Sequence, residues 1–240
     1  MIQNLNEELF SFIKKSPTGF HAVHELANYL TEAGFECLAE GNTWNLAEGG
    51  KYFVTRNQSA IIAFKVSRKD YSGFHIAASH SDSPTLKIKE SSEMNVENQY
   101  VKLNVEKYGG MLCAPWFDRP LSVAGRIIVK DGNRLTTKLI NVDRDLLMIP
   151  NLAIHMNREV NDGYKYNIQK DMLPLYRMSN SGKAKKGSPR KPVFPLIRSR
   201  EWIFSSTTAW KVRSGAATAS SSPLRVLTTF SVHSHPRWLC

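Results

Sequence analysis

The sequence predicts an α/β fold in which two helices and a few strands are followed by a β-rich part and an irregular tail. Three observations predict it. Two amphipathic helical patterns open the chain, apolar runs suited to buried strands come next, and strictly alternating segments follow. The composition, 42% hydrophobic and 22% charged over 240 residues, is that of an ordinary globular protein. Collagen-like, coiled-coil and fully disordered classes are therefore excluded.

Two helices are expected at the start of the chain. Leu5, Leu9 and Phe12 form an apolar stripe that ends near Pro17, because a residue before proline disfavours helical backbone. Residues 20–33 repeat this helical spacing, and Gly34 follows them in the position of a left-handed cap. This second helix carries His21 and His24 one turn apart. They could bind a metal as an i, i+3 pair, but the simpler expectation is that both lie on the helix surface.

Three strands are expected after the helices. Residues 51–55 and 59–66 should form a pair joined by a turn through Asn57, and the continuous apolar run 61–64 suits a sheet interior. Residues 74–78 predict a third, buried strand that ends just before His80. Because α/β sheets usually place chemistry at the carboxyl ends of their strands, His80 becomes a candidate functional residue.

After Pro84 the pattern changes to strict alternation, which is typical of half-exposed antiparallel strands. It is found in the segments 86–89, 100–105, 121–129 and 135–142. We therefore expect a separate, mostly β unit. The predicted organisation is residues 1–90 as the first domain, 91–176 as the β-rich unit and 177–240 as a tail.

The basic charge of the chain is confined to the tail. Residues 1–176 contain 20 basic and 20 acidic side chains, whereas residues 177–240 contain 12 basic and one acidic. The tail could be a nucleic-acid-binding arm, a solvated disordered segment, or a translation product that is not the intended protein. A recognised nucleic-acid motif and regular aromatic interleaving are both absent, so we do not expect nucleic acid as a partner. A non-catalytic basic module that binds nucleic acid or another acidic partner through this tail is kept as the alternative function.

Membrane insertion and secretion are not expected from the sequence. The chain has no run of ~18 apolar residues, the length that a membrane-spanning helix needs. Its start lacks the basic and apolar regions of a signal peptide. The three widely spaced cysteines, Cys37, Cys113 and Cys240, suit a reducing compartment, so we expect a cytoplasmic protein.

Three short stretches contain side chains that could carry chemistry. His80 and Asp82 lie two residues apart after a predicted strand, where the imidazole could bind a metal and the carboxylate could orient it, or Asp82 could cap a turn. Asp118 and Arg119 lie in an aromatic segment and suit a structural ion pair or an ordered polar network. His155 lies among apolar residues, where a partly buried, satisfied histidine is the simpler interpretation.

The order in which these motifs occur is more specific than any one of them. Together they resemble the aspartyl aminopeptidase family of zinc metallopeptidases, from residue 1 to about 176. The motifs are Ser16-Pro17-Thr18-Gly19-Phe20-His21-Ala22-Val23, Ser79-His80-Ser81-Asp82-Ser83-Pro84, Tyr108-Gly109-Gly110, Trp116-Phe117-Asp118-Arg119-Pro120-Leu121 with Ala124-Gly125-Arg126, and Ile149-Pro150-Asn151-Leu152-Ala153-Ile154-His155-Met156-Asn157-Arg158.

The resemblance implies an α/β catalytic domain with an inserted β-rich dimerisation domain, in a homo-oligomer that removes N-terminal residues, often Asp or Glu, from peptide substrates. It implies two zinc ions per site, which assist the attack of water on the peptide carbonyl. His80 would be a zinc ligand, with Asp82 as the catalytic carboxylate that buttresses it. His155 would contact metal or substrate, and Asp118 and Arg119 would be architectural.

The family's remaining metal donors, such as the aspartate of an S-P-R-L-D-D-L segment, are missing from this sequence. Codons permitted for residues 202–232, read one base earlier, can encode a segment containing S-S-P-R-L-D-D-L-Q. We therefore hypothesise a frameshift between about residues 176 and 202, which would leave the chain truncated and inactive because each zinc ion needs about four ligands. Such a chain should also expose the apolar residues 61–64 and 74–78.

Overall fold

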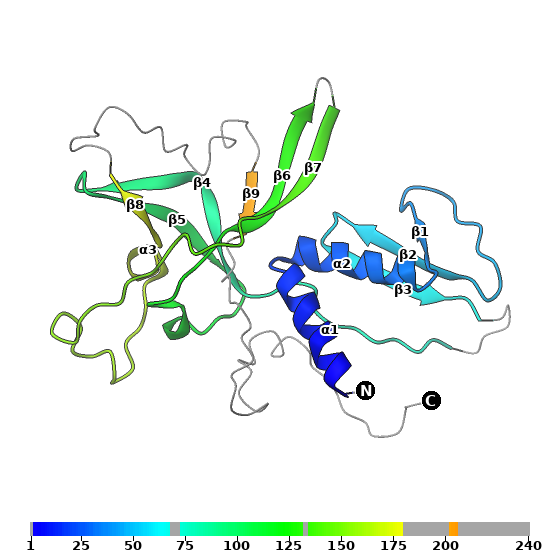
Figure 1. Cartoon of the computed structure of the whole chain (residues 1–240), viewed down its shortest axis with the longest axis horizontal. Coiled ribbons are helices and arrows are strands. Elements are labelled where there is room, and N and C mark those ends of the chain that lie inside the picture. Colours follow the sequence, from blue (N-terminus) through cyan, green and yellow to red (C-terminus); the bar gives the residue numbers. More distant parts are fainter. Residues whose placement is uncertain (1, 68–72, 132–133, 180–201, 206–240) are drawn as a thin grey trace. The chain divides into compact units, whose positions relative to one another are not determined.

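The computed structural model describes residues 2–67, 73–131, 134–179 and 202–205. These residues form two compact units that divide between Ser83 and Pro84 (Figure 1). The described residues before this division are the first unit, and those from Pro84 to Ser205 are the second. Within the described segments, no helix is both long enough and apolar enough to span a membrane.

The first unit opens with the two predicted helices, α1 (Ile2–Lys15) and α2 (Gly19–Glu32). Gly34 ends the second helix with a φ of 79°, the left-handed backbone that glycine adopts without a Cβ clash. The Phe35 N–H donates to the Leu30 carbonyl at 2.9 Å, which closes a Schellman motif. Both helices and the glycine cap are confirmed.

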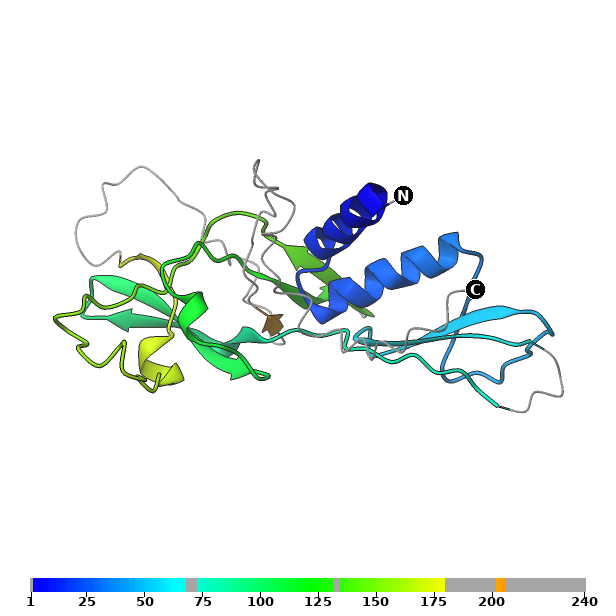
Figure 2. The ribbon, with the colours of Figure 1, turned by 90° about the horizontal axis from the view of Figure 1, so that it is seen from below.

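A three-stranded sheet follows, in the order β1 (Glu36–Leu38), β2 (Lys51–Arg56) and β3 (Ala60–Lys65). The predicted pair β2 and β3 is antiparallel, and Asn57 and Gln58 join it with φ values of 51° and 56°. Positive φ at both central residues is the hallmark of a tight hairpin turn. The helix α2 contacts all three strands and α1 packs on α2, so both helices lie on one side of this sheet (Figure 2).

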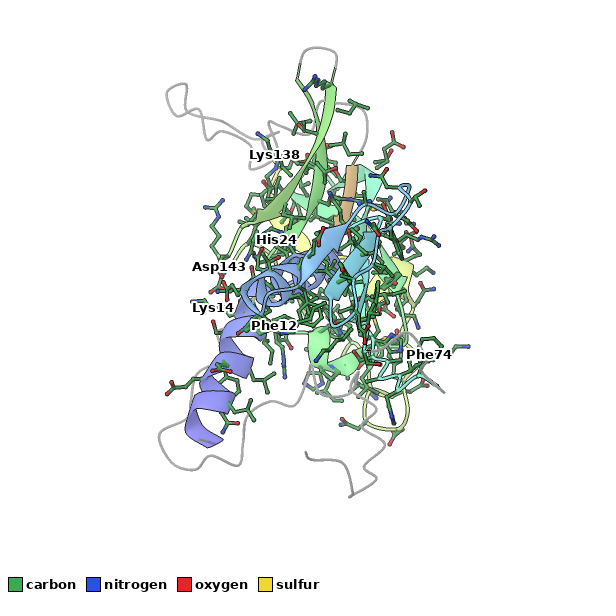
Figure 3. The ribbon with its side chains drawn as sticks, turned by 90° about the vertical axis from the view of Figure 1, so that its right-hand side faces the viewer. Phe12, Lys14, His24, Phe74, Lys138 and Asp143 are labelled. Carbon is green, nitrogen blue, oxygen red and sulfur yellow. The ribbon has the colours of Figure 1, made fainter. Side chains whose placement is uncertain are left out.

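The predicted third strand is wrong. Residues 73–80 have no regular secondary structure, and Phe74 (labelled in Figure 3) and Ile76 are 76% and 85% exposed. Burial throughout the run 61–64 is also wrong, because Ile62 is 66% exposed. A strand needs a hydrogen-bonded neighbour, and the described residues place β2 on one edge of β3 and no strand on the other. Residues 74–78 are therefore exposed as expected, whereas in the run 61–64 only Ile62 and Ala63 are exposed and Ile61 and Phe64 are half-buried.

The second unit is built from two antiparallel sheets, and the four strands predicted by alternation are all present. The first sheet has the order β4-β5-β8, from β4 (Thr85–Val96), β5 (Tyr100–Tyr108) and β8 (Leu175–Met178). The second has the order β7-β6-β9, from β6 (Ala124–Asp131), β7 (Arg134–Asn141) and β9 (Trp202–Ser205). Two short helices, η1 (Ala114–Trp116) and α3 (Ile168–Asp171), connect them.

The core of the second unit follows from the alternation along β5. Val101, Leu103 and Val105 are all 5% exposed or less, while Glu106 and Lys107 at the end of the strand are exposed. Leu103 and Val105 belong to one apolar cluster with residues from both sheets and from the intervening loops. It consists of Leu86, Ile88, Leu103, Val105, Trp116, Phe117, Leu121, Val123, Ile127, Leu147, Ile149, Met172 and Leu173. This cluster fixes the loops that connect the strands.

The expectation of an irregular tail is wrong at two places. The strand β8 continues to Met178, beyond the predicted start of the tail at residue 177. The strand β9 pairs antiparallel with β6. An edge strand offers unpaired backbone groups, so a short segment can add to it by backbone hydrogen bonds whatever its side chains. The other tail residues, 180–201 and 206–240, lie outside the described residues.

Candidate metal site

His80 and Asp82 are in direct contact in the first unit. The imidazole Nδ1 lies 3.0 Å from Asp82 Oδ1, and the two side chains are 70% and 44% exposed. When Nδ1 carries the proton it donates to the carboxylate, which leaves the Nε2 lone pair for a metal ion. The pair has the geometry of a histidine ligand with its orienting carboxylate.

The backbone around this pair is held on two sides. The Ser81 hydroxyl donates to the Ser59 carbonyl at 2.8 Å, at the start of β3. On the other side, a Cβ on Gly19 would lie 3.2 Å from the Ser81 carbonyl oxygen and 3.6 Å from Asp82 Cα. The first turn of α2 therefore approaches the His80–Asp82 segment closely, which glycine at this position permits.

The prediction that His21 lies on the helix surface is wrong. Thr18 is the N-cap of α2, and its hydroxyl lies 2.8 Å from His21 Nδ1 and accepts from the His21 N–H. His21 is only 9% exposed, because this capping contact folds its ring against the helix start. His24, one turn later, is exposed as expected (Figure 3). The pair therefore does not form a surface metal site.

Burial of His21, together with repulsion from His24, lowers the pKa of its imidazole below the usual 6.5. The unfolded chain then binds more protons than the folded one at this position, so stability rises with pH. We expect the first unit to lose stability as the pH falls below about 6.5, the unfolded pKa, towards the lower folded pKa. Urea unfolding of wild type and H21Q between pH 5 and 8 measures this.

The H21Q variant should be less stable at neutral pH but less dependent on pH. H75Q is the matched control, because His75 is exposed in the first unit and is not one of the groups that shift the pKa of His21. If the urea midpoint of wild type falls on acidification by no more than that of H21Q, folding does not lower the pKa of His21.

The other predicted site residues lie in the second unit. His155 is exposed in a turn, so the interpretation as a partly buried histidine is wrong. Asp118 and Arg119 follow Phe117, and Asp118 Oδ1 accepts from the Asn151 N–H at 2.9 Å. Of the predicted site residues, the described structure brings together His80 with Asp82, and Asp118 with the segment that leads to His155.

The donors around His80 fit one ligand and its buttress, and no more. Among the described residues, no group of three or more histidine, cysteine, aspartate or glutamate side chains could hold a metal ion. An imidazole Nε2 is a good zinc donor, but zinc prefers four ligands. The described residues therefore supply part of a zinc site.

Two contacts of functional interest could not be found from the sequence. The approach of Gly19 to Ser81 and Asp82 joins residues more than 60 positions apart, and the hydrogen bond from Asn151 to Asp118 spans 33 positions. Gly19 and Asp118 both lie in the motifs that carry the family resemblance, but these motifs do not show which distant residues the two contact.

Comparisons with known proteins point to one family. The model of the family of aminopeptidase I zinc metalloproteases (M18) matches residues 12–202. A probable M18 family aminopeptidase 2 of Clostridium acetobutylicum is 51% identical over 178 residues, which are 72% of this chain and 41% of the relative. The chain therefore spans less than half the length of this curated relative.

Solved structures agree in fold. The structure of Chaetomium thermophilum mApe1 has a TM-score of 0.73 and 33% identity, over 88% of this chain and 52% of that one. The S. cerevisiae mApe1 dodecamer, at 24% identity over 73% of this chain and 38% of that one, has a TM-score of 0.58. With a family match over residues 12–202 and the mixed α/β fold of these structures, the chain belongs to the M18 family of aminopeptidase I zinc metalloproteases.

Proposed function

We propose that this sequence provides the first part of a zinc-dependent aminopeptidase that removes N-terminal residues, preferentially Asp or Glu, from peptides. The observation that carries the proposal is the contact of 3.0 Å between His80 Nδ1 and Asp82 Oδ1, in a chain that belongs to a family of zinc metalloproteases. The contact turns Nε2 into the available donor, which is what a zinc ligand requires.

Each predicted site residue has a defined task in this proposal. His80 would hold a zinc ion through Nε2, and Asp82 fixes the ring orientation by accepting from Nδ1. His155, exposed in its turn, contacts metal or substrate. When bound, two zinc ions per site polarise the peptide carbonyl and activate water. Ser81 and Gly19 keep the backbone of the pair in place.

We propose that the two units have different roles. Residues 1–90 contribute to the catalytic domain, and residues 91–176 belong to a β-rich dimerisation domain. The two-sheet architecture of the second unit and its own apolar core support an independent role. Assembly into a homo-oligomer is supported by the dodecamer reported for the S. cerevisiae protein of similar fold.

We further propose a cytoplasmic location. Cys37 and Cys113 are both free thiols in the described structure, and Cys37 is exposed. Exposed thiols persist as such in a reducing compartment, where disulfides are rare. The location therefore agrees with the cysteine chemistry of the chain.

The chain as written should be inactive, because the described donors supply one ligand and one buttress. Incubated with zinc and peptides that begin with Asp or Glu, the purified 240-residue protein is expected to show no turnover. Sequencing the coding DNA from the codon of residue 176 to that of residue 232 tests the frameshift and shows whether the shifted frame contains the S-P-R-L-D-D-L segment. The protein translated from the restored frame should then cleave these peptides, and lose that activity to a chelator.

The two measurements separate the parts of the proposal. Turnover by the 240-residue chain would contradict its inactivity, and a shifted frame without the S-P-R-L-D-D-L segment would exclude the frameshift. A restored protein that cleaves only peptides beginning with neutral residues would overturn the substrate preference. A restored protein without any peptidase activity would overturn the proposed function itself.

A further inference from the structure

Asp118 is bonded on two sides to the strand-like segment that precedes the loop formed by residues 151–157. Its N–H donates to the Ile149 carbonyl at 2.9 Å, and its Oδ1 accepts from the Asn151 N–H at 2.9 Å. Phe117 and Ile149 form a parallel bridge at the same place. The backbone and the carboxylate of Asp118 therefore hold Ile149 and Asn151, between which the chain passes from the core into the loop.

This contact lies where the loop leaves the core of the second unit. Phe117 and Ile149 are 8% and 0% exposed, whereas residues 151–156 are all exposed. Within the loop, the backbone hydrogen bonds belong to short turns, such as the one from the Met156 N–H to the Ala153 carbonyl at 2.8 Å. These local bonds shape the loop but do not attach it to the core. The position of the loop therefore depends on the contacts that Asp118 makes where the loop begins.

The backbone of Asp118 has a φ of 54°, in the left-handed region. Aspartate and asparagine adopt this region more readily than other residues with a side chain, and glycine adopts it freely. Position 118 thus has two requirements, a left-handed backbone and a side-chain acceptor for the Asn151 N–H. Aspartate and asparagine meet both, glycine meets the first, and alanine meets neither.

From this geometry we infer that Asp118 is a positioning residue, which fixes the loop 151–157 and with it the imidazole of His155. The consequence for catalysis rests on the proposed role of His155, while the structural claim does not. Asp118 acts through the Asn151 backbone and has no contact with His155 among the described interactions. It orients the loop without taking part in the chemistry.

The experiment compares D118G, D118A and D118N in the full 240-residue chain by amide hydrogen exchange at millisecond-to-second labelling times. A peptide covering residues 150–158 reports the loop, and a peptide from the β4–β5 hairpin reports the stability of the unit. Loss of one hydrogen bond that holds the loop should speed loop exchange about tenfold in D118G and D118A. D118N should stay within about twofold of wild type, because its Oδ1 still accepts.

The D143A variant is the matched control. Asp143 (labelled in Figure 3) also has a left-handed backbone, with a φ of 46°, and lies outside the contact between Asp118 and the loop. It should therefore leave the exchange of the 150–158 peptide unchanged. Unchanged loop exchange in D118G would overturn the inference, as would equal acceleration of the hairpin peptide or failure of D118N to restore protection. None of these readings depends on zinc or on peptidase activity.

Discussion

Replacing Leu103 by alanine is expected to lower the free energy of unfolding of the second unit by about 3 kcal/mol. Leu103 is 0% exposed, at the centre of β5. Its N–H donates to the Pro174 carbonyl at 2.8 Å, so the surrounding backbone cannot collapse easily into the space left by the side chain. The loss combines the transfer free energy of the removed methyl groups with the cavity that remains.

Amide hydrogen exchange of the β4 and β5 peptides, measured against denaturant concentration, gives the free energy of this unit separately from the first. The matched control is L135A, which removes the same atoms from a side chain that is 68% exposed on β7. Its effect should stay within about 0.5 kcal/mol. If L103A costs no more than L135A, the apolar cluster around β5 does not hold the unit together.

The elements that the sequence predicted correctly are those that local chemistry determines. The helix α2 is bounded by Thr18 and Gly34, whose capping bonds reach no further than five residues. The hairpin of β2 and β3 is closed by Asn57, which tolerates a positive φ. In the second unit the alternation along β5 distinguishes the buried face from the exposed one.

The elements predicted wrongly depend on partners elsewhere in the chain. Residues 74–78 have the apolar character of a buried strand, but pairing needs a neighbour, and the described residues give them none. The strand β9 shows the opposite case, because pairing with β6 orders a segment whose composition predicts no strand. His21 is buried through its contact with the Thr18 hydroxyl, which the apolar periodicity of the helix does not reveal.

The candidate site divides in the same way. The two-residue spacing of His80 and Asp82 was sufficient to suggest that their side chains meet, and they lie 3.0 Å apart. The supports of that pair, from Ser59 and Gly19, come from distant parts of the chain and could only be seen in the folded structure. The same holds for the bond between Asp118 and Asn151.

The second large effect is expected at His80. In a zinc titration followed by the ring NMR signals of the histidines, His80, which contacts a carboxylate, should respond at a lower zinc concentration than His24, which is exposed on α2. The D82A variant should raise the half-saturating concentration for His80 about 10- to 100-fold, since an orienting carboxylate contributes this much to metal affinity. H80A should abolish the response of this site entirely.

The D82N variant separates orientation from charge. The amide oxygen that this variant introduces can still accept from Nδ1 but carries no negative charge, so the half-saturating zinc concentration of D82N should lie between those of wild type and D82A. The His24 signal is the internal control, because it should respond at the same zinc concentration in wild type, D82A and D82N. If D82A leaves the His80 titration unchanged, the contact between Nδ1 and Oδ1 does not prepare a zinc ligand, and the metal role of His80 fails with it.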